Sequence, residues 1–384
     1  MSMTVTHTEA AVCNFVEALR QLPDDRDNRG KRHALAFVVA GVVLAILSGR
    51  SKVSSIFRYL RNRIEWLREV TQHPGAGVVS RAHLPRLLAR VDWAALNTLI
   101  DQHFGVQVAL SAPDDWVAID GKVLRGTLAS EDKQSVVFAV SHASRTLLAQ
   151  APMQGSKASE IPVVRDLLTH SQLEARKVTL DAHHCNPTTT AQMHQAGGQY
   201  VVQVKANQPI LFTQCQHVAA TALPWGSHEE CEKGHGRLTI REGQCFDMRA
   251  LSLAPRWRDS GIHTLVVIKR HTVTCATQKT TSETAYYVSN QARSSNPHAQ
   301  AIALTGAIRQ HWHVESDNWI RDVTLQEDHI KTHSANQAQV MGCLRSLAMR
   351  LLRRFNVNNF QEALEDFADC PSKFEALLRR VKFL

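Results

Sequence analysis

The sequence lacks several features that mark disulfide-rich, zinc-ribbon and membrane-spanning proteins. Its 8 cysteines contain no Cys-x-x-Cys pair and no dense framework, which excludes a disulfide scaffold and argues against a structural zinc ribbon. The longest apolar run covers residues 34–47, which is shorter than the roughly 20 residues needed to cross a bilayer. It also lacks the N-terminal position of a signal peptide. We therefore expect reduced thiols and a cytoplasmic protein.

Acidic residues are too few to balance the basic ones. Lys plus Arg number 44 and Asp plus Glu 35, so the formal net charge is +9. Net charge is informative about binding partners and not about the fold. This excess of positive charge makes a polyanionic partner plausible. The chain has 384 residues, of which 44% are hydrophobic and 21% charged. This composition is typical of a globular protein, and the length suits two or three domains.

The first 105 residues are predicted to form an all-helical domain. Apolar residues recur at three- and four-residue spacing in 12–22, 34–47, 54–70 and 81–104. Basic residues cluster in and before the third of these segments, at Arg50, Lys52, Arg58, Arg61, Arg63 and Arg68. Two interpretations are open: a basic helix face that contacts phosphates, or the solvated outer face of a helical bundle.

At Trp116 the period changes to that of strands. Short apolar runs bounded by polar residues predict strands at 116–119, 136–140, 147–149, 178–180 and 200–204. Helical patterns at 156–168 and 187–195 lie between the last three strands. This order indicates an α/β unit built on a mixed sheet.

Strand-like runs at 237–241, 264–268 and 284–288 then indicate a β-rich insertion at about 208–290. Helical patterns follow at 298–324 and 336–354, with a weaker one in the tail. We assign residues 1–105 to the helical domain, 106–355 to an α/β domain and 356–384 to a helical tail.

Three acidic residues are candidates for a site. Asp120 and Asp181 each follow an apolar strand, at the sheet edge where α/β folds place their sites. Glu315 lies in a helical segment, where His311 and Asp322 share its face. Taken singly, each Asp fits a helix cap or turn and Glu315 fits a solvated helix face. Adjacent His183, His184 and Cys185 do not have the spacing of a zinc site.

Several spaced motifs together resemble insertion-sequence DDE transposases of the H-repeat-associated group. They are Asp-Arg-Asp-Asn-Arg-Gly-Lys-Arg-His (25–33), Ala-Ile-Asp-Gly-Lys-Val-Leu-Arg-Gly (118–126), Ser-Glu-Ile-Pro (159–162), Val-Thr-Leu-Asp-Ala (178–182), Val-Lys-Ala-Asn-Gln-Pro (204–209), Lys-Gly-His-Gly-Arg (233–237), Ile-Arg-Gln-His-Trp-His-Val-Glu (308–315) and Arg-Asp-Val-Thr-Leu-Gln-Glu-Asp (321–328). The resemblance implies an α/β fold: a ribonuclease-H-like mixed-sheet catalytic core with a β-rich insertion, preceded by an all-helical N-terminal associated domain.

The resemblance also implies a function. It places a metal-binding catalytic triad on Asp120, Asp181 and Glu315, which would hold Mg²⁺ or Mn²⁺, with two ions expected. The implied reactions are cleavage of double-stranded DNA at the terminal inverted repeats of an insertion sequence and strand transfer into target DNA. Because two element ends must be brought together in synapsis, we also expect a homodimer in the synaptic complex. The implied location is the bacterial cytoplasm, with nucleoid association when DNA is bound and no membrane.

Basic residues near the triad and on the insertion are candidate DNA contacts. They are Lys122, Arg125, Lys205, Arg237, Arg309 and Arg321. The alternative for each is ordinary surface charge.

The residues after Glu315 depart from the family pattern. Asp322 stands seven positions on, where the family has an acidic residue eight positions on, and the usual His before Trp319 is absent. Two further interpretations therefore stay open. One is a catalytically impaired relative that acts as a DNA-binding repressor or is a decaying remnant. The other is a nuclease with the same triad that hydrolyses DNA without strand transfer.

Overall fold

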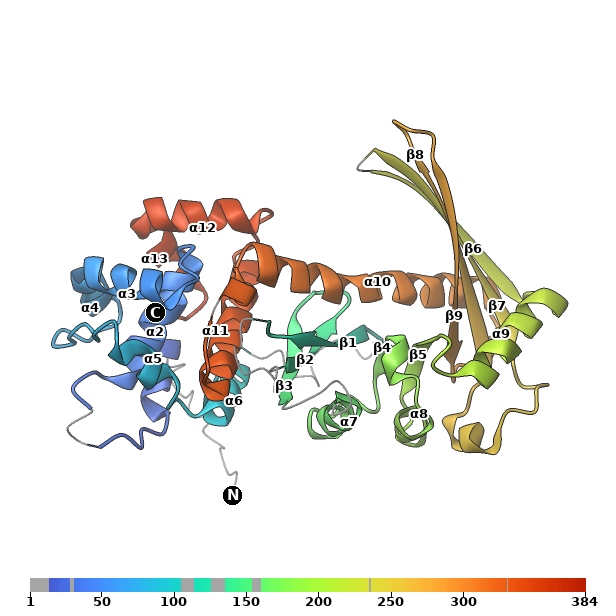
Figure 1. Cartoon of the computed structure of the whole chain (residues 1–384), viewed down its shortest axis with the longest axis horizontal. Helices are drawn as coiled ribbons and strands as arrows, with labels where there is room; N and C mark the ends of the chain where they lie inside the picture. Colours follow the sequence, from blue (N-terminus) through green and yellow to red (C-terminus); the bar gives the residue numbers. More distant parts are fainter. Residues whose placement is uncertain are drawn as a thin grey trace, which may run out of the picture. The chain divides into compact units, whose positions relative to one another are not determined.

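The computed structural model describes residues 14–27, 31–104, 114–125, 135–153, 160–234, 236–329 and 331–384, and these form two compact units (Figure 1). The helical unit contains the described residues of 14–104, Leu124, Arg125 and Trp319–Leu384. The sheet unit contains those of 114–123 and 135–318. The boundary between them falls inside helix α10 (Pro297–Val323). The domain boundary expected near residue 105 lies outside the described residues.

The helical unit is built around two buried helices. All residues of α2 (Leu35–Leu47) are buried, which confirms the expected buried helix, and α11 (Ala335–Arg354) packs against it. The other elements are α1 (Phe15–Ala18), η1 (Leu19–Gln21), α3 (Val53–Asn62), α4 (Ile64–Val70), α5 (His83–Leu88), α6 (Trp93–Phe104), η7 (Glu327–His329), α12 (Phe360–Asp369) and α13 (Pro371–Arg380). None of the helices in the described residues is long and apolar enough to cross a bilayer.

The C-terminal helices correct the expected division of the chain. Apolar side chains of α11, α12 and α13 share one buried core with those of the N-terminal helices. The helical unit therefore takes in residues from Trp319 onward, whereas the sequence pattern assigned residues up to 355 to the α/β domain. A helical pattern reveals an apolar face but not which distant helix covers it.

The sheet unit contains one mixed sheet of nine strands in the order β3-β2-β1-β4-β5-β9-β8-β7-β6. Strands β1, β4 and β5 are parallel neighbours, and all other neighbouring pairs are antiparallel. The bounds are β1 (Trp116–Val123), β2 (Ser135–Ser141), β3 (Leu147–Met153), β4 (Lys177–Leu180), β5 (Gln199–Val204), β6 (Gly226–Gly234), β7 (Arg237–Asp247), β8 (Thr264–Thr274) and β9 (Thr280–Ser289). The mixed sheet is thus confirmed.

The β-rich insertion continues this sheet instead of forming a separate one. Strands β9 to β6 extend it beyond β5, after helix α9 (Pro209–Thr221). Neither α9 nor β6 was predicted. Most residues of β6 are exposed and polar, so the strand lacks the apolar alternation that identifies half-buried strands.

Helices cover both faces of the sheet. Helices α7 (Glu160–His170) and α8 (Pro187–Gln195) lie on one face and α10 lies on the other (Figure 1). Strand residues alternate between the two sides: Val117 and Ile119 join the core on the α7 side, whereas Trp116 packs with residues of α10. This period of two decides which strand residues face α10.

Candidate active site

The strand register brings Asp120 and Asp181 side by side. In the parallel pair of β1 and β4, Ile119 lies opposite Leu180, and each Asp is the next residue. Both carboxylates belong to the set that faces α10, because Ile119 and Leu180 point into the core on the other side. One detail differs from expectation. Asp181 follows the end of β4, but Asp120 lies inside β1, whose pairing with β2 continues to Val123.

A buried polar contact positions Glu315 at the same edge. On α10, His311 Nδ1 lies 2.9 Å from Thr179 Oγ1 of β4, and His142 Nε2 lies 3.0 Å from the same hydroxyl. Burial lowers the pKa of His142 to about 3 and that of His311 to about 4, so both rings are neutral at pH 7. Glu315 is one helical turn beyond His311, and Asp181 is two residues beyond Thr179. The contact therefore places both carboxylates on the same side of the sheet.

The negative charge of Asp181 acts on the carboxyl groups of both Asp120 and Glu315. Burial raises the pKa of Asp120 to about 7, and the negative charges of Asp181 and Glu160 add to the increase. Burial also raises the pKa of Glu315, as does the charge of Asp181, while Lys205 opposes the increase. Asp181 is thus the carboxylate that acts on both of the others. Removing negative charge, or adding a cation, would relieve this repulsion.

The oxygen atoms of this set suit a hard divalent cation. Carboxylates are preferred ligands of Mg²⁺ and Mn²⁺, and no softer ligand is needed. In the part of the chain that the structure describes, no three His, Cys, Asp or Glu side chains stand close enough together to hold a metal ion as they are. Glu315 is only partly buried, which leaves its side chain room for a rotamer change toward a bound ion.

Asp181 has a structural role as well as a candidate chemical one. Its Oδ1 accepts hydrogen bonds from the backbone N–H groups of His183 (2.9 Å) and His184 (3.4 Å), and thereby caps a 3₁₀ turn at Ala182–His184. The side chain is 43% exposed, and its Oδ2 has no hydrogen bond among the described residues. Asp181 Oδ1 therefore caps a turn, as one of the two interpretations expected, and the candidate chemical role of this Asp stays a prediction.

A second contact between α10 and the sheet involves Asn318. Its Nδ2 donates to Asp120 Oδ2 over 3.3 Å, and its Oδ1 is buried without a hydrogen-bond partner in the described residues. Asn318 lies within the segment where the sequence departs from the family pattern. The helix nevertheless continues unbroken through this segment to Val323.

Sequence analysis did not identify Glu160 as a site residue. This Glu begins α7, is 5% exposed, and has Oε1 3.0 Å from Nε2 of the fully buried His184. Its carboxyl group lies against the backbone of Gly121, where an added Cβ would come within 2.5 Å of it. The signals were the Gly directly after Asp120 and the Ser-Glu-Ile-Pro motif, which contains Glu160.

The candidate DNA contacts near the carboxylates differ in exposure. Lys205 follows β5 as Asp181 follows β4, is exposed, and influences Glu315. Lys122 is only 7% exposed, so the expected surface contact with a phosphate does not fit its position. Arg125 is exposed, and its backbone N–H donates to Asp328 Oδ1 over 3.1 Å within the helical unit. Arg237 is exposed at the start of β7.

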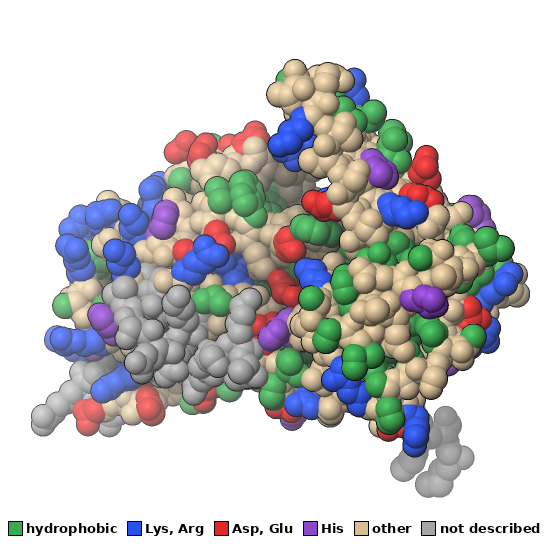
Figure 2. Space-filling model, turned by 45° about the vertical axis from the view of Figure 1, so that its right-hand side comes forward, with side chains coloured by type: hydrophobic (Ala, Val, Ile, Leu, Met, Phe, Trp, Pro, Cys, Tyr) green, Lys and Arg blue, Asp and Glu red, His purple; other side chains and the backbone are tan. Residues whose placement is uncertain are grey.

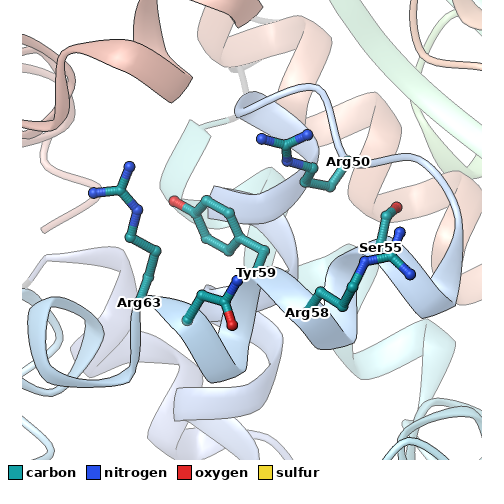
Figure 3. A pocket seen from close by; sticks show the side chains of 6 residues that line it. Arg50, Ser55, Arg58, Tyr59 and Arg63 are labelled. Atoms are coloured by element: carbon teal, nitrogen blue, oxygen red, sulfur yellow. The ribbon is translucent and has the colours of Figure 1, made fainter.

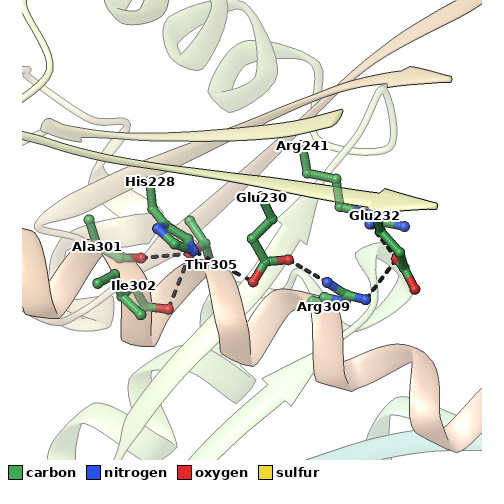
Figure 4. Close-up of polar contacts among 8 residues, drawn as sticks. All are labelled: His228, Glu230, Glu232, Arg241, Ala301, Ile302, Thr305 and Arg309. Carbon is green, nitrogen blue, oxygen red and sulfur yellow. Dashed lines mark hydrogen bonds and ion pairs between the residues drawn. The ribbon is translucent and has the colours of Figure 1, made fainter. Parts of the chain in front are cut away.

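Arg309 and Arg321 are engaged in contacts inside the protein. Arg309 of α10 forms ion pairs with Glu230 and Glu232 of β6, the second over 2.8 Å (Figure 4). It thereby fastens the exposed edge strand to the helix. Arg321 has 4% of its side chain exposed, pairs with Glu327 over 3.4 Å, and donates to Ser346 Oγ over 2.7 Å. The expectation that Arg321 contacts DNA is wrong, because this side chain is buried.

The helical unit contains a segment that matches a known family. Residues 16–104 match the family model described as DDE_Tnp_1-associated. This match covers the N-terminal helices of the helical unit.

Two relatives extend this similarity to both units. The H repeat-associated putative transposase YhhI of Escherichia coli (strain K12) is 25% identical over 354 residues, which are 88% of this chain and 90% of the relative. The putative transposase YncI of Escherichia coli O157:H7 is 24% identical over 357 residues, 89% of this chain and 88% of the relative. These similarities confirm the resemblance to the H repeat-associated group and support a transposase role.

Proposed function

We propose that this chain is a DDE transposase that cleaves DNA at the ends of an insertion sequence and transfers the strands to target DNA. The observation that carries the proposal is the placement of Asp120 and Asp181 by adjacent parallel strands on the side of the sheet that faces α10, with the charge of Asp181 acting on both Asp120 and Glu315 of that helix. We further propose that strands β1 to β5, with α7, α8 and α10, form a ribonuclease-H-like core.

Asp120, Asp181 and Glu315 would hold two Mg²⁺ or Mn²⁺ ions. When bound, such a pair supplies activation of the attacking oxygen and stabilisation of the leaving oxygen in a phosphodiester exchange. The protein supplies the placement: β1 and β4 fix two ligands by register, and the contact of His311 with Thr179 fixes the helix that carries the third. Exposed Lys205, beside Glu315, would contact the scissile phosphate.

The proposed partners are double-stranded DNA with terminal inverted repeats, target DNA and a second copy of the chain. A homodimer suits the reaction because two element ends must be brought together. The excess of basic residues supports a polyanionic partner.

A catalytically impaired DNA-binding relative is the second candidate. The one-residue shortening after Glu315 favours it, because a displacement of ~1 Å at a reacting group can lower a rate ~10²-fold. The unbroken course of α10 and the contact between Asn318 and Asp120 favour the active enzyme.

DNA that flanks the coding sequence provides a substrate for the test, because terminal repeats of the element would lie within it. We expect the purified protein to cut end-labelled flanking DNA at short inverted repeats in Mg²⁺ and not in EDTA, leaving 3′-hydroxyl ends that join to a second duplex. Binding without any cleavage would support the impaired relative. Cleavage without joining would support a nuclease.

A further inference from the structure

A basic pocket lies in the helical unit, and its residues are distant in sequence from the three carboxylates. Arg50 comes from the loop after α2, and α3 with its C-terminal cap supplies the remaining residues. The pocket has a volume of about 330 Å³ (Figure 3). It is lined by Arg50, Ser55, Arg58, Tyr59, Asn62 and Arg63.

The lining offers hydrogen-bond donors and contains no acidic residue. Among the described residues, the Arg50 and Arg58 side chains form no ion pair or hydrogen bond, and Arg63 donates through Nη2 to the carbonyl of Ala368 over 3.2 Å. A guanidinium group has five N–H donors, so Arg63 keeps others available. Asn62 accepts from Arg61 through its Oδ1, which leaves its amide N–H groups for a ligand. Such a set fits an oxyanion.

Tyr59 completes the donor set. Its hydroxyl oxygen accepts a hydrogen bond from Ser48 Oγ over 3.2 Å, so its own proton can be donated elsewhere. Burial raises the pKa of this phenol, which keeps the proton in place at neutral pH. The guanidinium groups of Arg50 and Arg63 lie on either side of the hydroxyl (Figure 3).

The surroundings favour a polyanion over a single small anion. Lys52 and Arg61 are exposed on or next to α3 but do not line the pocket, so positive charge continues beyond it. Figure 2 shows Lys and Arg side chains gathered on the surface of the helical unit. Regularly spaced phosphates can occupy the pocket and neutralise its neighbours at once, as the backbone of DNA does.

We propose that this pocket binds a backbone phosphate of double-stranded DNA, through Arg50, Arg58, Arg63 and the Tyr59 hydroxyl. The proposal rests on the proposed function, and it decides between the two interpretations of the basic helix. On this proposal, the basic cluster of α3 contains a phosphate site in the pocket and is more than a solvated helix face.

Binding of a fluorescent 30-base-pair duplex in EDTA, measured by anisotropy over a series of KCl concentrations, tests this. We expect the R50Q/R58Q double variant to lose about tenfold or more in affinity and the slope of log K against log salt to fall by about one. R58K should lose part of this affinity, because Lys keeps the positive charge but lacks the planar guanidinium group. R61Q is the matched control on the same helix outside the pocket, with an expected loss below threefold. Circular dichroism confirms folding of each variant.

Three results would overturn the proposal. A loss for R61Q as large as that for R50Q/R58Q would show a general basic face without a phosphate pocket. Unchanged duplex affinity in R50Q/R58Q would also contradict the phosphate pocket. So would a result in which the variants lose binding of inorganic phosphate but keep their affinity for the duplex. Failure of the wild-type protein to bind any duplex would contradict the proposed function as well. If the wild-type protein cleaves DNA and the pocket variants bind DNA normally, only the pocket proposal is contradicted and the proposed function is retained.

Discussion

Asp120 is held in surroundings that disfavour its negative charge. Its pKa rises from 3.8 to about 7 because the group is buried and because Asp181 and Glu160 are negative. An Asp with a raised folded-state pKa contributes stability that is present below pH 4 and is lost as the pH rises to about 7. Above that pH, folded and unfolded states are both ionised and the loss is complete.

We therefore predict a pH-dependent effect of D120N in EDTA. The free energy of unfolding of D120N minus that of the wild type should increase between pH 4.5 and about 7 and then level off. Urea unfolding at four pH values measures it. D114N is the matched control, since Asp114 is exposed and its pKa is lowered by Lys177. A difference that does not change with pH would contradict the assigned environment of Asp120.

Gly121 allows the close approach of Glu160. An alanine Cβ there would meet the Glu160 carboxyl group at 2.5 Å, so G121A should be destabilised by about 1–3 kcal/mol and should lose DNA cleavage. Gly306 of α10 has nothing within 4 Å of an added Cβ, so G306A should instead gain roughly 0.5–1 kcal/mol. Thermal unfolding of both variants checks this. If the stability of G121A equals that of the wild type, Glu160 can move away without a cost in free energy.

At the scale of elements, α10 links the candidate site to the helical unit. The helix runs without a break from Pro297 to Val323, and Gln326 then adopts a positive φ of 48° before the 3₁₀ turn η7. This positive φ marks a turn of the chain between α10 and η7, in the segment where the sequence analysis expects a change of spacing. The turn also places Arg321 in its buried contact with Glu327.

R321Q should therefore change stability and not DNA binding. Breaking this buried ion pair removes one of the two Arg side chains that interact with the buried Glu327 carboxylate, at a cost of roughly 3–5 kcal/mol. Denaturant unfolding gives this value, and duplex anisotropy gives the affinity. R237Q, at an exposed position of β7, is the contrasting variant. A selective loss of DNA affinity in R321Q, with normal stability, would restore the DNA-binding role that the sequence suggested for Arg321.

Much of the element order could be predicted from the sequence because apolar periodicity reports burial. The fully buried α2 and the strands β1, β2, β4 and β5 are cases where the pattern sufficed. Strand β6 could not be predicted, because it has no apolar face and is held instead by ion pairs with Arg309. For the site, Asp120, Asp181 and Glu315 were recognised through motifs. Glu160 was not, because its role depends on a contact between the start of α7 and Gly121 of β1, which are distant in sequence.

At the scale of the whole molecule, the charge of +9 predicts salt-sensitive binding to DNA. If Lys and Arg side chains neutralise about 6–10 phosphates, affinity should fall ~10³–10⁵-fold between about 50 and 200 mM salt. A salt titration of duplex binding measures this slope. A flat response would show that the basic excess does not serve DNA.

The proposed transposase activity depends above all on the three carboxylates. The decisive measurement is the Mg²⁺-dependent cleavage rate of terminal-repeat DNA by D120N, D181N and E315Q beside the control D114N, with duplex affinity measured on the same proteins. We predict that the three site variants lose cleavage yet bind DNA as the wild type does, and that D114N cleaves normally. Near wild-type cleavage by any one of the three would contradict the triad at that position.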